Sequence, residues 1–314
     1  MNDQQRILCN YFTNSINEQP GDQPIRVFFN LIQADFLDIK ESLSSLPNNN
    51  NVKNVRLEYL TENIALIGPY TDGQKISLHE TFLSFLWAYI YSIFVTTPMG
   101  GKSVSDYENL EANQLRKYAI GLMKGFSVWD KETLPNPELF GKDKKRFIGV
   151  ANSVFINSVR FILLHEFAHI FLSHTSVPSE LRTPENLNKM EIDADNVAIE
   201  WALQTFDIDK EFNGKLGLIA ALNSLSFSPN KFSDSLKHPA PEDRIISCLE
   251  RLKADEKDFI WGYAVWSIME WQTNFEVFYV PTSYKKGNGF KELFYDIVKE
   301  LKEYKITGIN KFKK

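Results

Sequence analysis

The chain has almost no cysteine: only Cys9 and Cys248 occur among its 314 residues. Two cysteines cannot build a disulfide framework, and so few of them fit a reducing compartment. An excess of positive charge is also missing, because 35 basic residues face 40 acidic ones and the formal net charge is −5. A mildly acidic chain is a poor candidate for general nucleic-acid binding, so we expect no direct nucleic-acid partner.

The uncharged apolar segment at residues 81–95 is too short to cross a bilayer. Residues 81–95 carry no charge, but they fall short of the roughly 20 residues that a bilayer span needs. We interpret residues 78–95 as a buried helix, and membrane contact by this helix is the alternative. Residues 1–25 also lack an apolar stretch followed by a small-residue cleavage site, so we expect no signal peptide and a cytoplasmic location.

The chain does contain enough apolar sequence for a sizeable core, since 43% of its residues are hydrophobic. Strand character is predicted early in the chain, at residues 25–31, 55–60 and 63–68. Helical periodicity and capping signals dominate after residue 78. We therefore expect an α+β fold that is mostly helical. The predicted regions are a mixed α/β region at 1–105, a core at 106–252 and a helical C-terminal region at 253–314.

Residues 165–169 read His-Glu-Phe-Ala-His, which is the pattern H-E-x-x-H inside a predicted helix. Four residues turn an α-helix by about 400°, so His165 and His169 lie on one face, about 6 Å apart along the axis. Both imidazoles can then reach one tetrahedral Zn²⁺. Glu166 lies beside these ligands and can act as the general base toward a water held at the metal. Two histidines without a metal are the alternative, but their apolar neighbours make unpartnered imidazoles costly.

The next predicted helix offers a third ligand. Glu191 follows His169 by enough residues for a loop and an antiparallel return, and Glu191 and Asp195 share one helix face at i and i+4 spacing. We expect Glu191 to ligate zinc. We expect Asp195 to accept a hydrogen bond from the outer ring nitrogen of a ligating histidine. Asp193, which points elsewhere, is the alternative ligand.

His238 and Arg244 bracket a proline-containing turn into a further helix. His238 suits the role of hydrogen-bond donor to the oxyanion that develops during peptide hydrolysis. Arg244 could pair with Asp195 or Glu191 and fix their orientation. A surface histidine at a helix start is the alternative for His238. Two other histidines are expected to be structural: His174 at a helix end, off the ligand face, and His79 before the apolar helix.

Three motifs together resemble the gluzincin-type metallopeptidases: H-E-x-x-H at 165–169, E-x-x-x-D at 191–195 and H-P-x-x-x-x-R at 238–244. The chain more closely resembles the Lit-type phage-exclusion peptidases. That resemblance rests on ILLHEFAHIFLSH (162–174), MEIDADNVAIEWAL (190–203) and HPAPEDRI (238–245), with support from the apolar segment after residue 77 and a W-x(5)-P-x-P-E pattern at 129–138.

The resemblance implies a zincin-like catalytic core in residues 106–252, with a small N-terminal β-sheet packed on the helix that bears His165 and His169. It further implies zinc as the cofactor and an endopeptidase that acts inside the bacterial cell. In that family the substrate is translation elongation factor Tu, recognised with a phage-encoded activator peptide. Two other functions compete: a membrane-associated processing zinc peptidase, and a non-enzymatic, metal-stabilised sensor or binding module. A purely structural metal site has no need for a general base at Glu166, which argues against the sensor.

Overall fold

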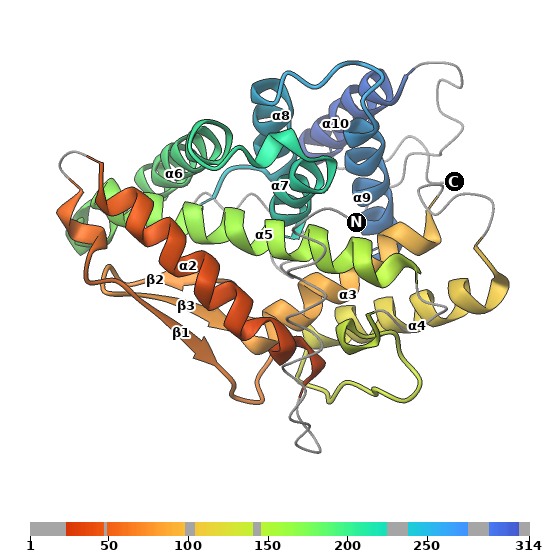
Figure 1. The fold of residues 1–314 in the computed structure, drawn as a ribbon. Helices are drawn as coiled ribbons and strands as arrows, with labels where there is room; N and C mark the ends of the chain where they lie inside the picture. The colour runs from red at the N-terminus through yellow and green to blue at the C-terminus, as the bar shows by residue number, and fades with distance from the viewer. Residues whose placement is uncertain are drawn as a thin grey trace.

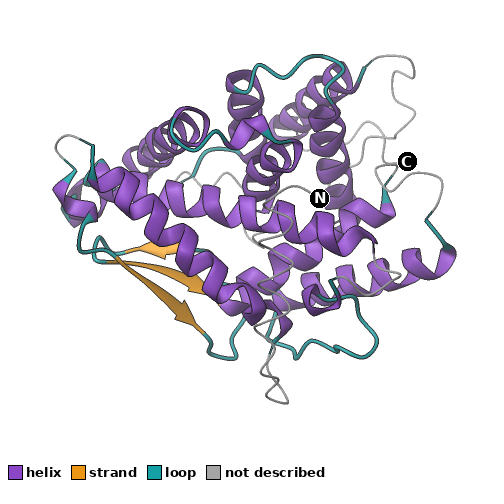
Figure 2. Cartoon of the chain, viewed as in Figure 1, coloured by secondary structure: helices purple, strands orange, loops and turns teal. Residues whose placement is uncertain are grey.

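The computed structural model describes residues 23–46, 49–97, 104–140, 146–224, 238–275 and 289–307. Its α-helices are α2 (Phe29–Ser44), α3 (Glu80–Thr96), α4 (Asp106–Leu122), α5 (Arg146–Phe171), α6 (Pro184–Gln204), α7 (Phe212–Ser224), α8 (Pro241–Arg251), α9 (Phe259–Phe275) and α10 (Phe290–Thr307). Its strands are β1 (Arg56–Leu60), β2 (Tyr70–Thr71) and β3 (Lys75–His79). Figures 1 and 2 show that helices dominate and that the strands form one small sheet, so the predicted mostly helical α+β fold is confirmed.

The three strands form a mixed sheet in the order β1-β3-β2. β1 pairs with β3 in parallel, and β2 pairs with β3 antiparallel through Tyr70–Ser77 and Thr71–Ile76. β2 is therefore an edge strand of the described sheet. The sheet contacts α5 through β2 and β3, as the sequence predicted for the sheet and the helix that bears His165 and His169.

The strands predicted at 25–31 and 63–68 are wrong. Residues 24–28 form the 3-10 helix η1 (Pro24–Phe28), which leads directly into α2, and residues 63–68 are loop. Ile25, Phe28, Ile32, Phe36 and Ile39 are all buried. Their spacing of three and four residues is that of a helix face, and this longer period outweighs the short apolar run at the start of the segment.

The apolar segment 81–95 is an interior helix. Every side chain of α3 from Glu80 to Val95 is buried in the protein, so none of them is available to a bilayer. α5 alone, among the described residues, has the length and apolarity of a membrane span, and 67% of that stretch is buried inside the protein. α5 runs through the middle of the molecule, against α2, α3, α6 and α7 (Figure 1). Residues on α5 are consequently held from several sides.

The C-terminal helices pack beyond α7. α9 contacts α7 and α10, and α8 contacts α6 and α7. Lysines of α10 also reach the first turn of α8, where Lys302 Nζ lies 2.5 Å from Asp243 and Lys305 Nζ lies 2.6 Å from Glu242. α10 is thereby fastened to the helix that carries Arg244.

Candidate metal centre

Two consecutive helices, joined by a short connection, carry the three candidate metal ligands. α5 ends at Phe171, and Ser173 adopts the left-handed conformation with φ 59°. Two 3-10 turns follow, η5 (His174–Ser176) and η6 (Ser179–Leu181), before Thr183 caps α6 by accepting a hydrogen bond from the Asn186 amide. The chain therefore turns back quickly, and α6 packs beside the C-terminal half of α5.

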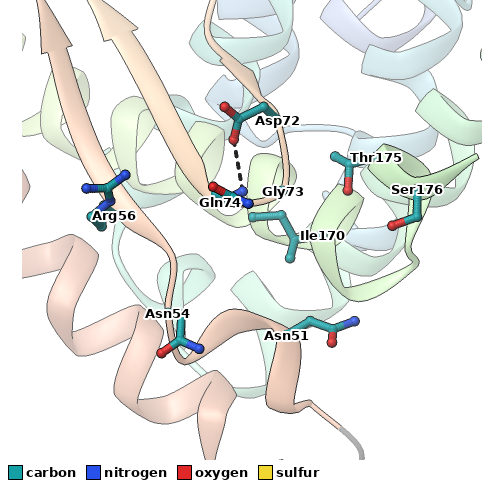
Figure 3. A pocket seen from close by; sticks show the side chains of 9 residues that line it. All are labelled: Asn51, Asn54, Arg56, Asp72, Gly73, Gln74, Ile170, Thr175 and Ser176. Atoms are coloured by element: carbon teal, nitrogen blue, oxygen red, sulfur yellow. Dashed lines mark hydrogen bonds between the residues drawn. The ribbon is translucent and has the colours of Figure 1, made fainter.

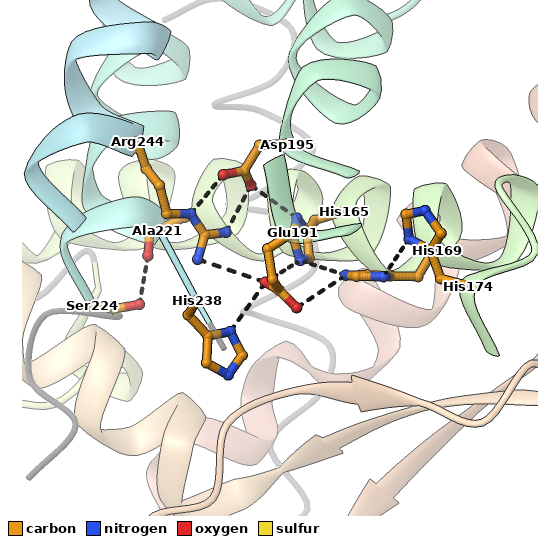
Figure 4. Close-up of polar contacts among 9 residues, drawn as sticks. All are labelled: His165, His169, His174, Glu191, Asp195, Ala221, Ser224, His238 and Arg244. Carbon is orange, nitrogen blue, oxygen red and sulfur yellow. Dashed lines mark hydrogen bonds and ion pairs between the residues drawn. The ribbon is translucent and has the colours of Figure 1, made fainter. Parts of the chain in front are cut away.

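His165, His169 and Glu191 each direct one ligand atom to a common centre, and these atoms all lie within 4.8 Å of one another. The Nε2 atoms of the two histidines are 3.1 Å apart, and Glu191 oxygens lie 3.6 Å from His165 and 3.5 Å from His169 (Figure 4). Ligands at about 2.1 Å from one ion, with tetrahedral angles, stand about 3.4 Å apart. Two imidazole nitrogens and one carboxylate with this spacing fit Zn²⁺.

A second carboxylate and a guanidinium support this cluster. Asp195 Oδ1 lies 3.0 Å from Nδ1 of His165, on the opposite side of the ring from Glu191. Arg244, on α8, donates two hydrogen bonds to Asp195, at 2.6 and 2.7 Å, and also lies 3.8 Å from Glu191. The contact of Asp195 with Nδ1 holds His165 with Nε2 turned toward Glu191, the orientation a ligating histidine needs, and Arg244 in turn holds Asp195.

The charges of the cluster are strongly coupled. Burial opposes ionisation of Glu191, but hydrogen bonds from His165 and His238 outweigh burial and hold the pKa of Glu191 well below its usual range. Burial likewise opposes the charged form of His165, but hydrogen bonds to Asp195 and Glu191 outweigh it and raise the pKa of that ring. His169 differs, because burial and the neighbouring His165 lower its pKa to about 3. The pKa of Asp195 is lowered too, so two anionic carboxylates lie beside His165 and stabilise positive charge there.

Glu166 and His238 border the same space. A cavity of about 310 Å³ is lined by the three candidate ligands, Glu166, His238, Arg244, edge strand β2 and the two residues before it, among others. Glu166 is buried, and burial raises its pKa to about 7. His238 lies at the margin with its Nδ1 3.5 Å from Glu191, and its side chain remains partly exposed. The structure therefore brings all seven residues predicted for the site into one cluster.

The remaining candidates lie around this cluster. Asp193, the alternative ligand, is half-buried and is not among the atoms grouped at the centre. His79 is a structural residue, as predicted, since its Nδ1 accepts a hydrogen bond from the Thr81 amide at the start of α3. His174 is at the helix end as expected, yet its Nδ1 lies 2.9 Å from Nδ1 of His169. The sequence does not predict this contact, because helical spacing gives no sign of the left-handed turn at Ser173.

Comparison with known proteins bears on the identity of the site. A family model described as Peptidase U49 matches residues 76–264, which is more than half of the chain. The chain belongs to the peptidase U49 family. The matched region begins at β3 and includes α5, α6 and α8, so it contains every residue predicted for the site.

One curated relative of this chain is the "Cell death peptidase" of Escherichia coli (strain K12). The two chains are 26% identical over 195 residues, which cover 56% of this chain and 62% of that relative. The chain thus spans less than two thirds of the length of the relative that it matches. No solved structure matches the chain. The comparisons confirm the resemblance to the Lit-type peptidases. They also support peptidase activity, because the matched family is one of peptidases.

Proposed function

We propose that the chain is a zinc-dependent endopeptidase with a zincin-like core, acting in the cytoplasm. The observation that carries this proposal is the cluster of His165, His169 and Glu191, with buried Glu166 at its side, in a member of a peptidase family. The donor set and its spacing suit zinc, which when bound supplies Lewis-acid catalysis to a peptide carbonyl and a water.

The chain's own residues supply the remaining chemistry. Glu166 takes a proton from the attacking water and delivers it to the leaving amine, a task that suits a carboxyl in a buried position. His238, at the margin of the cavity, donates a hydrogen bond to the carbonyl oxygen as negative charge develops there. Asp195 and Arg244 keep His165 oriented and neutralise one another inside the protein.

The position of the sheet supports a peptide as substrate. β2 is an edge strand, and Tyr70 and Thr71 line the cavity beside the metal cluster. An edge strand presents backbone donors and acceptors to which an extended peptide can add as a further strand. A substrate bound in this way would pass its backbone close to Glu166 and the cluster.

We further propose elongation factor Tu as the substrate and a phage-derived peptide as the activator. The support is the resemblance to the Lit-type peptidases in the motifs at 162–174, 190–203 and 238–245. The shared family with a curated cell death peptidase supports it as well. The burial of the α3 side chains disfavours the alternative of a membrane-anchored processing peptidase that uses residues 81–95.

The test compares the zinc-loaded chain with a Glu166→Gln variant. Each is incubated with a bacterial lysate, and with purified elongation factor Tu with and without the phage-derived peptide, and cleaved products are identified by mass spectrometry. The glutamine keeps the volume of the side chain but cannot take a proton from water. We expect the native chain to cleave its substrate and the Glu166→Gln variant to leave it intact. Equal cleavage by the native chain and the Glu166→Gln variant would contradict the hydrolytic mechanism. Cleavage of lysate proteins without any cleavage of elongation factor Tu would contradict the proposed substrate.

A further inference from the structure

The two ligand histidines of α5 are arranged alike, each with Nε2 toward the centre and Nδ1 toward a supporting residue. His165 has Asp195 behind it, with Nδ1 and Oδ1 3.0 Å apart. His169 has His174 behind it, with the two Nδ1 atoms 2.9 Å apart and the ring centroids 5.0 Å apart (Figure 4). A ligating histidine usually donates its outer N–H to a carboxylate, a carbonyl or water. Here a second imidazole occupies that position.

The proton positions follow from this geometry. If Nε2 of His169 faces the metal, its proton is on Nδ1, and that N–H can only donate. His174 must then accept with an unprotonated Nδ1 and carry its own proton on Nε2. Nδ1 of His174 therefore orients the ring of His169 without adding a third negative charge beside Glu191 and Asp195.

The backbone conformation before His174 brings the ring back toward α5. Ser173 has φ 59° and ψ 26°, a left-handed conformation that is unfavourable for a residue with a side chain. A continued helix would carry residue 174 past the ligand face, because His169 and His174 are five residues apart. The left-handed turn instead returns His174 to His169. Such strain persists where the surroundings hold it, and it gathers at functional sites.

Two elements hold the turn that carries His174. Arg182 donates hydrogen bonds to the carbonyl oxygens of Thr175 and Val177, both at 3.0 Å. The hairpin between β2 and β3 also lies against Thr175, so closely that a Cβ on Gly73 would be 2.7 Å from Thr175 Oγ1 (Figure 3). Because both contacts hold the turn, it can position the ring of His174.

We propose that His174 is a positioning residue of the metal site: it accepts a hydrogen bond from Nδ1–H of His169 and holds His169 with Nε2 toward His165 and Glu191. This inference rests on the proposed metallopeptidase function, and it assigns to His174 a role in metal affinity rather than in the reaction itself.

The experiment measures zinc affinity of the full-length chain by competition with a chromophoric chelator. The variants are His174→Ala, which removes the acceptor, His174→Asn and His174→Gln. An asparagine oxygen can occupy the place of Nδ1, whereas a glutamine amide reaches only the place of Nε2. Ser176→Ala, in the same turn, is the matched control. We expect the alanine and glutamine variants to bind zinc about 10–100-fold more weakly, and the asparagine and control variants to stay near the native affinity.

The visible absorption of the cobalt-loaded proteins gives a second readout, which should change with alanine or glutamine and stay native with asparagine. Circular dichroism of the metal-free proteins checks folding, and the asparagine–glutamine pair decides the question if the alanine variant does not fold. The role of His174 would be overturned if the alanine or glutamine variant bound zinc as tightly as the native chain. It would also be overturned if the asparagine and glutamine variants lost zinc affinity equally. Neither result would touch the metallopeptidase proposal. A native chain that binds no zinc would overturn the metallopeptidase proposal and this inference with it.

Discussion

Replacing Arg244 by methionine should destabilise the protein strongly, because the buried carboxylate of Asp195 then loses its guanidinium partner and keeps only the contact with His165. The side chains of Arg244 and Asp195 are 5% and 8% exposed, and two hydrogen bonds of 2.6 and 2.7 Å join them. Breaking a buried ion pair by removing one member costs about 3–5 kcal/mol, since the remaining charge stays desolvated. Urea unfolding of the metal-free protein, monitored by circular dichroism, should show that Arg244→Met lowers the free energy of unfolding by about that amount.

The adjacent residue supplies a matched control. Asp243 pairs with Lys302, but their side chains are 49% and 47% exposed, and an exposed pair contributes less than about 1 kcal/mol. Lys302→Met should therefore leave the urea midpoint almost unchanged. The double variant Arg244→Met with Asp195→Asn should lose less than the sum of the single changes, since the amide carries no charge. A loss below about 1 kcal/mol for Arg244→Met would refute the reasoning that burial makes this pair costly to break.

Three further changes probe other parts of the site. Glu191→Ala should lose most bound zinc in metal analysis, while Asp193→Ala should keep it; the reverse would make Asp193 the ligand. His238→Ala should retain zinc but lose about 10²–10³-fold in turnover, the usual cost of one oxyanion donor, and native turnover would remove it from the mechanism. Gly73→Ala should lower thermal stability by about 1–2 kcal/mol, because φ is +93° and the new Cβ would meet Thr175 at 2.7 Å; an unchanged melting temperature would contradict this.

The closeness of His165, His169 and Glu191 could be predicted from the sequence, because helical geometry constrains it. His165 and His169 lie on one face by spacing alone, and a short loop followed by an antiparallel helix leaves Glu191 few other places to lie. The early strands were harder to predict, because local propensity and the longer pattern disagree there. Residues 25–31 have strand-like composition, but the buried spacing that continues to Ile39 belongs to a helix.

Contacts that depend on single backbone angles could not be predicted. The left-handed conformation of Ser173 is unusual for a residue other than glycine, and it alone redirects His174 toward His169. The choice of Arg244 between Asp195 and Glu191 was open for a similar reason, because it depends on how α8 docks against α6. The structure gives Asp195 two hydrogen bonds and leaves Glu191 a longer contact.

The attachment of α10 to α8 has a practical consequence for anyone who shortens this protein. The region shared with the family ends at residue 264, which would suggest trimming the chain there for expression. Lys305 lies far beyond that end, yet it is the cation beside Glu242, whose carboxylate is buried two residues before Arg244. A trimmed chain would lose the lysine that pairs with this acid in the first turn of α8, the helix that carries Arg244. α10 therefore contacts the helix that carries Arg244, although α10 lies outside the region that the family model matches.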